Sequence, residues 1–389
     1  MKIGLLAARM DVFGGVENVM LRTALHLRSR GHEPVMVSTA FHAELARALQ
    51  AGTVEMRVVG NPHDTGRIGR LAAMRAATTE ALADCEAVNV HNFPANLWIE
   101  EQEGRPLVYA CHEPPRHLHE DAMNPVFLGS RFNTRPWYTR AWDSLMNTRW
   151  RALDLSATRR LRRILTNSRY TAGKIEQIYG FSAVPCYFAP LPPDPSSPAP
   201  CTASEFRMLF VGRLTPMKNL ETAVEAVALL PAEVRPLLHV VGEGDQRSRL
   251  EALSRERGIS ERVKFLGGIP DAQLLREYAE AKAVLYIPFD EPMGLVPMEA
   301  GLLGVPSVVS SHGGPAEIVV NEKTGLYADA LDPQAVANAL LRFALDESLR
   351  QRCGKAAAAR MRAEMHWGLY THALETLLGI PTPTAEEPT

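Results

Sequence analysis

The sequence contains few cysteines, and none of them has the spacing of a zinc site. The five thiols are isolated in the chain and odd in number, and no C-x-x-C pair occurs. This pattern predicts neither a zinc cage nor a disulfide framework, and free thiols favour a reducing cytoplasm. The cysteines are Cys85, Cys111, Cys186, Cys201 and Cys353.

Long apolar runs, charge imbalance and cofactor motifs are also missing. No segment approaches the ~18 apolar residues of a membrane span, and the apolar run that ends at Arg9 is too short for a signal peptide. The formal net charge of −2 gives the chain no electrostatic reason to coat nucleic acid. Neither G-x-G-x-x-G nor D-x-D is present. We therefore expect no dinucleotide cofactor, no bound metal and no nucleic-acid partner.

What the chain does contain is the composition of a soluble globular protein, with 46% hydrophobic and 22% charged residues. Its 389 residues exceed one ordinary core and predict two domains. Short apolar runs alternate with helical patterns along the chain, which predicts parallel sheets with helices on both faces. Expected strands are Lys2–Ala8, Pro34–Thr39, Ala87–His91, Leu107–Cys111, Met208–Val211, Leu237–Val241, Val263–Leu266 and Ala283–Ile287. Expected helices include Glu17–Arg30, Asn219–Leu230, Gln246–Arg257 and Asp271–Ala281.

A proline-rich segment separates the two series of strands and helices. Residues 189–204 begin APLPPDPSSPAP, a composition that favours an extended, semi-rigid connector. We therefore expect an N-terminal domain over 1–188 and a C-terminal domain over 205–365, with a cleft between them. In open α/β sheets ligands bind beyond the carboxyl ends of the strands, so the turns after strands should carry the function.

Two glutamates flank an expected helix start in the segment PFDEPMGLVPMEAG. Glu291 and Glu299 are eight residues apart, and the helix should begin near Gly294. The backbone N–H groups of Gly294, Leu295 and Val296 would then form an anion site. A carboxylate on the second turn can accept hydrogen bonds from the vicinal hydroxyls of a ribose. Taken alone, the same pair also fits an N-terminal acid followed by a solvated helical glutamate.

Further motifs accompany this pair in a fixed order. They are TNSRYTAGKIEQIYG from Thr166, FVGRLTPMKNLE from Phe210, VGEGD from Val241, FLGGIPDAQL from Phe265 and HGGPAEIVVNEKTGLY from His312. The ordered set resembles the retaining glycosyltransferases of family GT4 (glycosyltransferase group 1), and the resemblance covers nearly the whole chain. It implies the GT-B fold, in which two Rossmann-like, doubly wound α/β domains face each other across a cleft. It also implies a last helix, over 366–380, that crosses back to the N-terminal domain.

The resemblance assigns roles to individual residues. Arg213 and Lys218 would hold the donor diphosphate together with Gly15, Gly294, Leu295 and Val296. Glu299 would bind the ribose, and Glu291 and His112 would contact the transferred sugar as the catalytic residues. Contacts to the base would come mainly from backbone around Gly242, Gly268 and Ile269. Taken alone, Arg213 and Lys218 could also be two solvated cations in a loop with no ligand. Gly14 and Gly15 could likewise form an ordinary turn between a strand and a helix.

Other residues of the N-terminal domain are weaker candidates for the acceptor side. Gly14, His91 and Arg116 follow expected strands, but a histidine in this setting is more often a structural residue, and Arg116 fits a salt bridge equally well. A metal site at His112, Glu113 and the nearby histidines is disfavoured. Pro114 and Pro115 prevent the helix that H-E-x-x-H geometry needs.

The implied reaction is transfer of a sugar, of the hexosyl type, from a nucleoside-diphosphate sugar to an acceptor hydroxyl. The resemblance implies retention of configuration by front-face substitution, and the protein's own cations would replace a metal ion. Three alternatives share the fold: a nucleotide-sugar epimerase, a glycosyl phosphorylase and a non-catalytic nucleotide-sugar-binding protein. Base, sugar, acceptor and oligomeric state are not specified by any motif.

One basic segment is relevant to the question whether the acceptor is a small molecule or a lipid. Residues 131–163 contain nine arginines with three interleaved tryptophans, which fits peripheral contact with an anionic membrane. It also fits a solvated helix face whose tryptophans pack inward, and we favour that interpretation. The acceptor is accordingly a small molecule or a lipid-linked one. We expect a cytoplasmic protein, soluble or peripheral at the inner face of the membrane.

Overall fold

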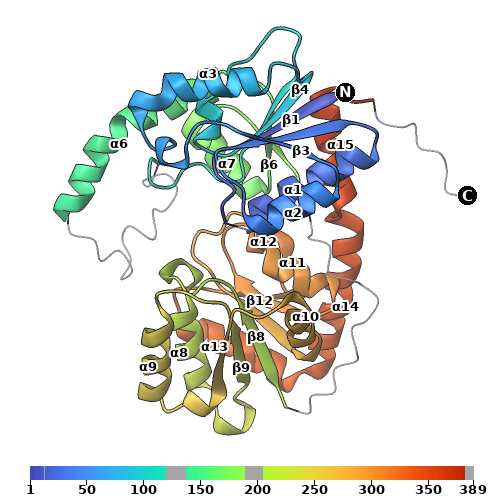
Figure 1. Ribbon diagram of the computed structural model, residues 1–389. Helices are drawn as coiled ribbons and strands as arrows, with labels where there is room; N and C mark the ends of the chain where they lie inside the picture. Colours follow the sequence, from blue (N-terminus) through green and yellow to red (C-terminus); the bar gives the residue numbers. More distant parts are fainter. Residues whose placement is uncertain (13, 120–136, 189–204, 382–389) are drawn as a thin grey trace, which may run out of the picture. The chain divides into compact units, whose positions relative to one another are not determined.

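The computed structural model describes residues 1–12, 14–119, 137–188 and 205–381, with backbone only for 137–146. The chain divides into two compact units (Figure 1). The first, unit 1, comprises Met1–Cys186 with Gly368–Thr389, and the second, unit 2, comprises Tyr187–Trp367. The expected linker over 189–204 lies outside the described residues.

Unit 1 is built on a seven-stranded sheet in the order β3-β2-β1-β4-β5-β6-β7, and every strand pair is parallel. Its strands are β1 (Lys2–Ala7), β2 (Glu33–Ser38), β3 (Glu55–Val58), β4 (Ala87–His91), β5 (Leu107–Ala110), β6 (Ile164–Thr166) and β7 (Val184–Pro185). Its helices are α1 (Gly15–Ser29), α2 (Ala43–Ala51), α3 (Leu71–Ala81), α6 (Trp137–Thr158), α7 (Arg169–Tyr179) and most of α15 (Trp367–Leu378).

Unit 2 contains a six-stranded parallel sheet in the order β10-β9-β8-β11-β12-β13. Its strands are β8 (Arg207–Val211), β9 (Leu237–Val241), β10 (Val263–Gly267), β11 (Ala283–Tyr286), β12 (Ser307–Ser310) and β13 (Gly325–Ala328). Its helices are α8 (Leu220–Leu229), α9 (Arg247–Glu256), α10 (Asp271–Glu280), α11 (Leu295–Leu302), α12 (Pro315–Ile318), α13 (Pro333–Leu345) and α14 (Glu347–Glu364).

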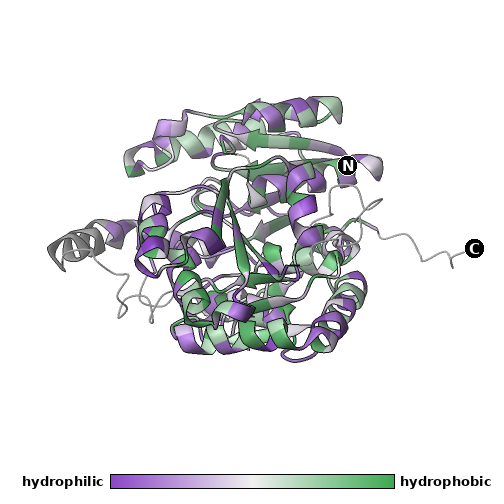
Figure 2. Cartoon of the chain, turned by 90° about the horizontal axis from the view of Figure 1, so that it is seen from below, coloured by the Kyte–Doolittle hydropathy of each residue, from purple (hydrophilic) through white to green (hydrophobic). Residues whose placement is uncertain are grey.

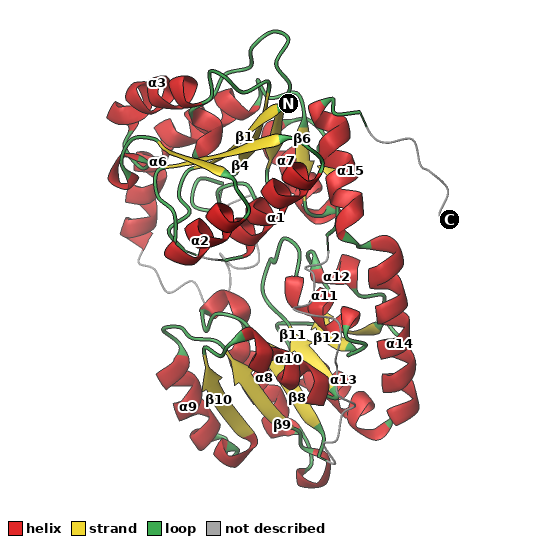
Figure 3. Ribbon diagram, turned by 45° about the vertical axis from the view of Figure 1, so that its right-hand side comes forward, coloured by secondary structure: helices red, strands yellow, loops and turns green. Residues whose placement is uncertain are grey.

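The central strands are apolar because helices cover both faces of each sheet. All residues of β4, β9 and β11 are buried, as expected for parallel strands enclosed on both sides. Figure 3 shows the strands of each unit lying between helices, and Figure 2 shows that hydrophilic residues are concentrated on the helices. The predicted alternation of strands and helices and the two parallel sheets are confirmed.

Each sheet has one point at which the strand order reverses. In unit 2, β9 and β10 extend from β8 in one direction, while β11, β12 and β13 extend in the other. In unit 1 the corresponding neighbours are β1 and β4. The loops that follow two such neighbouring strands diverge, and the crevice between them is where doubly wound sheets bind ligands.

The last helix, α15, packs on unit 1. Glu375, only 5% exposed, accepts a hydrogen bond from Nε of Arg30 and lies 2.9 Å from Nε2 of His26 on α1. Tyr370, Leu374 and Leu378 of α15 are buried. In the part of the chain that the structure describes, no helix is sufficiently long and apolar to cross a membrane.

Candidate functional site

Two oppositely charged side chains meet at the β8/β11 reversal of unit 2. Nζ of Lys218 lies 2.7 Å from Oε2 of Glu291, and each side chain is 20% exposed. Lys218 follows β8 and Glu291 follows β11, so neighbouring strands deliver the two groups to the same edge of the sheet. Both residues were predicted as site residues from the sequence, but their ion pair was not.

Hydrogen bonds between the loop after β8 and the loop after β11 fix the position of this ion pair. The N–H of Phe289 donates to the carbonyl of Met217 at 2.9 Å. Asn219, which adopts a positive φ of 56° and is 1% exposed, donates its side-chain amide to the carbonyls of Ile287 and Ala330. The turn that carries Lys218 is therefore tied directly to the end of β11.

Tyr286, the last residue of β11, lies beneath the pair. Its hydroxyl is 3.4 Å from Nζ of Lys218, and the ammonium group lies 5.6 Å from the centre of its ring. Burial, followed by the charge of Glu291, raises the pKa of Tyr286 well above its usual value. The phenol therefore stays neutral and supplies a polar wall beside Lys218 and Glu291.

Arg213 contributes a second cation just after β8. Its side chain is exposed, and the structure shows no ion pair between it and any described residue. A guanidinium group in this setting is available to a phosphate ligand. It differs in this respect from Lys218, whose charge is already matched by Glu291.

Helix α11 presents backbone donors close to Glu291. Gly294 precedes the helix with φ 119°, a conformation that favours glycine, and Leu295 is the first helical residue. The N–H groups of Leu295 and Val296 donate to no described residue, which leaves them available to an anion. Pro297 has no N–H, so the donors are confined to the very start of the helix.

A pair of glycines supports the Glu291 loop from the other side. The N–H of Gly314 donates to the carbonyl of Glu291 at 2.8 Å. A Cβ atom on Gly314 would lie 2.3 Å from Cα of Met293, and one on Gly313 would lie 2.7 Å from the carbonyl oxygen of Glu291. The two loops therefore pack backbone against backbone, which only glycine permits here.

Glu299 lies on the second turn of α11 and is half-buried. Its Oε2 accepts a 2.6 Å hydrogen bond from the hydroxyl of Tyr278. Burial raises the pKa of the Glu299 carboxyl, and the hydrogen bond from Tyr278 opposes that rise. The structure shows no hydrogen bond from a described residue to Oε1, so this oxygen can accept one from a ligand hydroxyl.

The residues predicted to contact a base lie beyond β9 and β10. Gly242 has φ 129°, donates its N–H to Gly267, and would place a Cβ atom 2.0 Å from the carbonyl oxygen of Gly212. Gly242 therefore also has a packing role. The N–H of Gly268 lies 3.5 Å from Oε1 of Glu243, and Ile269 packs against the core beneath it. Base binding by these residues stays a prediction.

In unit 1, the predicted glycines begin the helix that follows β1. Gly15 is the first residue of α1, and the N–H of Gly14 donates to Oε2 of Glu17 at 3.1 Å. The glycines thus lie at the β1/β4 reversal of unit 1. One of the N–H groups there is already satisfied by the helix itself.

His91 and His112 are brought together at the carboxyl ends of β4 and β5. Nδ1 of His91 lies 3.0 Å from Nε2 of His112, and Nε2 of His91 lies 2.7 Å from Oδ1 of Asn89. His91 is 1% exposed and His112 9%. Both ring nitrogens of His91 are therefore occupied inside unit 1, so this residue can act on a ligand only through His112.

Arg116 forms an ion pair with Glu113, the structural alternative considered for it. His119 lies 2.8 Å from Oδ2 of Asp154, so these polar groups pair with each other. No cluster of three or more potential metal ligands exists among the described residues. The segment over 131–163 lies partly outside the described residues. Within its described part, Trp150 packs against the core of unit 1.

Sequence reasoning did not identify Tyr286, Asn219, Asn89 or Gly314. Tyr286 and Asn89 lie within strands and read as core residues in the sequence. The signal for Gly314 was its glycine pair followed by proline, a combination typical of a tight turn. Asn219 follows Lys218 directly and precedes a helix, where asparagine often marks a helix start.

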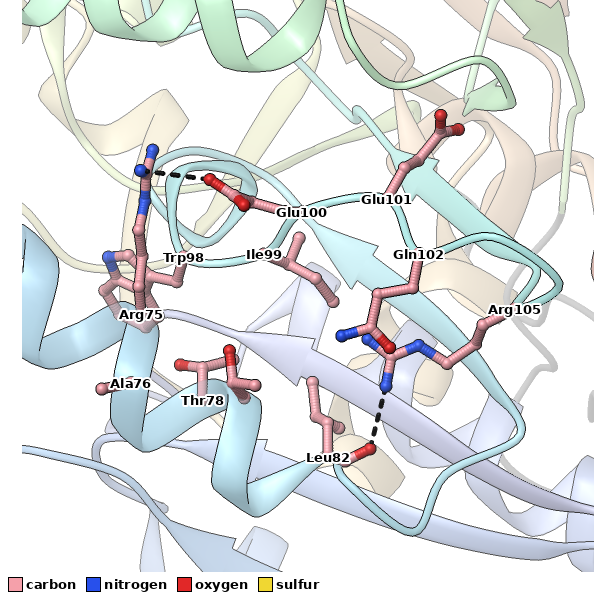
Figure 4. A pocket seen from close by; sticks show the side chains of 11 residues that line it. Arg75, Ala76, Thr78, Leu82, Trp98, Ile99, Glu100, Glu101, Gln102 and Arg105 are labelled. Atoms are coloured by element: carbon pink, nitrogen blue, oxygen red, sulfur yellow. Dashed lines mark hydrogen bonds and ion pairs between the residues drawn. The ribbon is translucent and has the colours of Figure 1, made fainter.

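A separate cavity of about 280 Å³ lies in unit 1 between α3 and the segment 98–105 (Figure 4). Arg75 points toward Glu100, Arg105 donates to the carbonyl of Leu82, and the Thr78 hydroxyl is buried without a described partner. The cavity is next to the amino ends of β4 and β5, at the edge of the sheet opposite to His91. We assign it no part in the reaction proposed below.

Solved structures with the same architecture show the fold class of this chain. A sucrose-phosphate synthase from Thermosynechococcus elongatus aligns with a TM-score of 0.74 and 20% identity over 97% of this chain and 98% of that chain. The Anabaena protein HepE in complex with UDP aligns with a TM-score of 0.76 and 21% identity over 98% of this chain and 100% of that chain. Two parallel-sheet units of this kind constitute the GT-B fold.

Sequence comparisons identify the family. The model described as Glycosyltransferase Family 4 matches residues 13–196, and the model described as Glycosyl transferases group 1 matches residues 202–360. The chain belongs to this glycosyltransferase family.

Curated relatives align over shorter stretches. The chain is 35% identical to the D-inositol 3-phosphate glycosyltransferase of Corynebacterium jeikeium over 176 residues, which is 43% of this chain and 42% of that protein. It is 32% identical to a glycogen synthase of Mycobacterium tuberculosis over 162 residues, 41% of this chain and 39% of that protein. The aligned part thus spans about two fifths of each relative's length.

Proposed function

We propose that this protein transfers a sugar from a nucleoside-diphosphate sugar to an acceptor hydroxyl, with retention of configuration and without a metal ion. The observation that carries the proposal is the Lys218–Glu291 pair at the β8/β11 reversal, beside the N–H groups of Leu295 and Val296, which donate to no described residue. Cationic, anionic and backbone-donor groups converge there at the position where doubly wound sheets bind ligands.

The diphosphate end of the donor is assigned to Arg213, Lys218 and the start of α11. Cleavage of the sugar–phosphate bond increases negative charge on the leaving diphosphate. Fixed cations and helix-start amides therefore stabilise the transition state more than the ground state. Arg213 and Lys218 together supply two positive charges to the leaving diphosphate. We therefore assign no role to a divalent ion.

The ribose and sugar ends are assigned to the two glutamates. Oε1 of Glu299 accepts from a ribose hydroxyl while Tyr278 holds Oε2. Glu291 binds sugar hydroxyls and stabilises positive charge that develops on the sugar. On donor binding, the diphosphate shares the Lys218 ammonium, and the Glu291 carboxylate turns toward the sugar.

Retention of configuration is assigned to front-face substitution. Retention by double displacement requires a carboxylate nucleophile on the opposite face of the sugar. Three of the described acidic residues near the carboxyl edge of unit 1 already have partners: Asp11 pairs with Arg9, Glu17 accepts from Gly14, and Glu113 pairs with Arg116. These contacts support the front-face route, in which the leaving phosphate takes the acceptor proton.

The donor class is further supported by structural relatives. HepE structures contain UDP and UDP-glucose, and the curated relatives include an enzyme that glycosylates D-inositol 3-phosphate. We therefore propose a nucleoside diphosphate hexose as the donor and a hydroxyl-bearing small molecule or lipid as the acceptor.

A donor panel tests the proposal. The protein is incubated with UDP-, GDP- and ADP-hexoses, with and without chelator, and released nucleoside diphosphate and the anomeric configuration of the product are measured. We expect release with at least one donor in the presence of chelator, and strong loss of release in Glu291→Gln. Tight donor binding without release would instead identify a binding protein. An epimerised free sugar nucleotide would identify an epimerase, and release only with inorganic phosphate a phosphorylase.

A further inference from the structure

The hydroxyl of Tyr286 lies next to both members of the Lys218–Glu291 ion pair. Tyr286 is 3% exposed, and its hydroxyl is 3.4 Å from Nζ of Lys218, the atom that lies 2.7 Å from Oε2 of Glu291. The same ammonium group lies over the tyrosine ring, 5.6 Å from its centre. The phenol and the two charged side chains therefore form one cluster of three polar groups.

The directions of the hydrogen bonds in this cluster follow from the chemistry of its members. An ammonium group only donates, so the oxygen of Tyr286 accepts from Lys218. The hydrogen of the phenol then needs an acceptor, and Glu291 is that acceptor. After burial, the charge of Glu291 and its hydrogen bond with the phenol raise the pKa of Tyr286, which is the effect expected when the neutral phenol donates.

The ring of Tyr286 is fixed by the sheet. Tyr286 ends β11, where it is paired with Val309 of β12, and it belongs to the hydrophobic core of unit 2. A Cβ atom on Gly294 would lie 3.3 Å from Cε1 of the ring, so the ring also packs against the residue that precedes α11. Lys218, in contrast, carries its charge on a flexible four-carbon stem. The phenol is therefore the more rigid of the two partners of Glu291.

This difference in rigidity becomes important when a donor binds. In the proposed reaction the diphosphate shares the Lys218 ammonium, which weakens the contact of Lys218 with Glu291. Glu291 is only 20% exposed, and a carboxylate in such a place is destabilised when it loses a hydrogen-bond partner. The position of Tyr286 does not depend on Lys218, so its hydroxyl stays beside the carboxylate when the ammonium group moves.

We propose that Tyr286 is a positioning residue for sugar transfer, whose hydroxyl holds the Glu291 carboxylate in place when the donor diphosphate takes up Lys218. The inference rests on the proposed function. It adds a fixed hydrogen-bond donor, which allows the ion pair to open while Glu291 keeps a partner. Tyr286 acts through Glu291 and does not itself contact the sugar.

Tyr286→Phe tests this role, because it removes the hydroxyl and retains the ring that packs against Gly294. With a donor that wild type uses, we expect kcat to fall about tenfold or more, the scale of a lost hydrogen bond to a charged group. KM should change less than kcat, since Lys218 and the start of α11 still bind the diphosphate. In a Glu291→Gln background, Tyr286→Phe should cause little further loss, because the phenol acts through the carboxylate.

Tyr327→Phe is the matched control in unit 2. The hydroxyl of Tyr327 donates to the backbone carbonyls of Ala316 and Val319. Its removal should lower the thermal stability of the protein and leave kcat close to that of wild type. Equal kcat in wild type and Tyr286→Phe would overturn the positioning role, and so would an equal loss of kcat in the two tyrosine variants.

The hydrogen bond can also be measured without any substrate. Infrared difference spectra between a chain and its Tyr286→Phe counterpart isolate the C–O stretch of this phenol, whose frequency distinguishes a donor from an acceptor. In Lys218→Met, which removes the ammonium group as donor binding would, we expect the phenol still to donate. In Glu291→Gln the donation should weaken.

The two measurements separate this inference from the proposed function. A phenol that does not donate in Lys218→Met would overturn the inference, whatever the activity of the protein. If wild type turned over no donor while the phenol donated in Lys218→Met, the proposed function would fail and the contact between Tyr286 and Glu291 would stand.

Discussion

Lys218 and Glu291 are 73 positions apart in the sequence, yet their charged atoms are 2.7 Å apart. Each is partly shielded from water, so the ion pair is stronger than one on the open surface. A donor diphosphate competes with Glu291 for Lys218. The site therefore has a cation that is already oriented and an acid that is free to change partner.

Removing the Lys218 ammonium should impair transfer more than folding. In Lys218→Met the stem of the side chain is retained and the charge is lost. We expect kcat/KM to fall about 10²-fold or more, the scale of losing one preorganised transition-state contact. Released nucleoside diphosphate is the readout, and Lys323→Met, at an exposed turn of unit 2, is the matched control. Equal activity of the two variants would remove Lys218 from the diphosphate site.

The two buried histidines predict acid sensitivity. In the unfolded chain they take up protons near pH 6.5, whereas in the folded chain burial keeps them neutral down to about pH 4 for His112 and lower for His91. Because the unfolded state then binds more protons, the free energy of unfolding falls as pH drops through this window.

For His112 alone this loss is about 3 kcal/mol between about pH 6.5 and about pH 4. Urea unfolding at a series of pH values should show it as a falling midpoint for unit 1. His112→Gln should flatten the profile, whereas His63→Gln should leave it unchanged. An identical slope in wild type and His112→Gln would contradict the assignment.

At the scale of elements, the loop after β11 is determined by its neighbours more than by its own sequence. The turn before α8 and the Gly313–Gly314 turn after β12 each hydrogen-bond to it. Strand neighbours β8, β11 and β12 thus align three loops at one edge of the sheet. The position of Glu291 depends on the contacts between these loops.

Gly314→Ala should disturb that arrangement. The added Cβ atom would lie 2.3 Å from Cα of Met293, so the Glu291 loop must move. Overpacking of this kind costs about 1–3 kcal/mol of stability, and activity should fall by more than the stability loss explains. Thermal unfolding and nucleotide release are measured together.

Gly173→Ala provides the matched control, because Gly173 lies in α7 and a Cβ atom added there would have no neighbouring atom within 4 Å. In a helix interior this change should stabilise by about 0.5–1 kcal/mol. If Gly314→Ala behaved in the same way, the close packing of the two loops would not be essential.

At the scale of the whole molecule, the chain forms two units, and its last helix belongs to the first. Unit 1 and unit 2 have separate hydrophobic cores. Helix α15 adds the buried side chains of Tyr370, Leu374 and Leu378 to unit 1, and its Glu375 contacts His26 of α1. Stability of the N-terminal sheet therefore depends on residues at the far end of the chain.

Ending the chain after Trp367 should weaken unit 1 selectively. The loss of three buried side chains is expected to cost more than about 4 kcal/mol. Hydrogen exchange should accelerate in β1 and β4 while β8 and β9 keep their protection. A chain ending at Pro381 is the length control. Equal protection of β1 and β4 in both truncated chains would show that α15 does not stabilise unit 1.

Much of the fold could be predicted from the sequence, because a strand buried on both faces is apolar throughout. The expected strands Ala87–His91 and Leu237–Val241 agree with β4 and β9 at both ends. Helix ends were less accurate: α1 begins at Gly15 instead of Glu17. Capping depends on local contacts, here between Glu17 and Gly14, which periodicity does not reveal.

By itself the sequence determined the two α/β units, the family and the residues gathered near β8 and β11, since apolar periodicity and ordered motifs are local properties. Only the tertiary structure decided that Lys218 pairs with Glu291, that Tyr278 holds Glu299 and that Asn89 and His91 orient His112. Those contacts join residues far apart in the chain or buried within strands. Their partners depend on which strands become neighbours, and hydrogen-bond directions follow only once the buried groups are in contact.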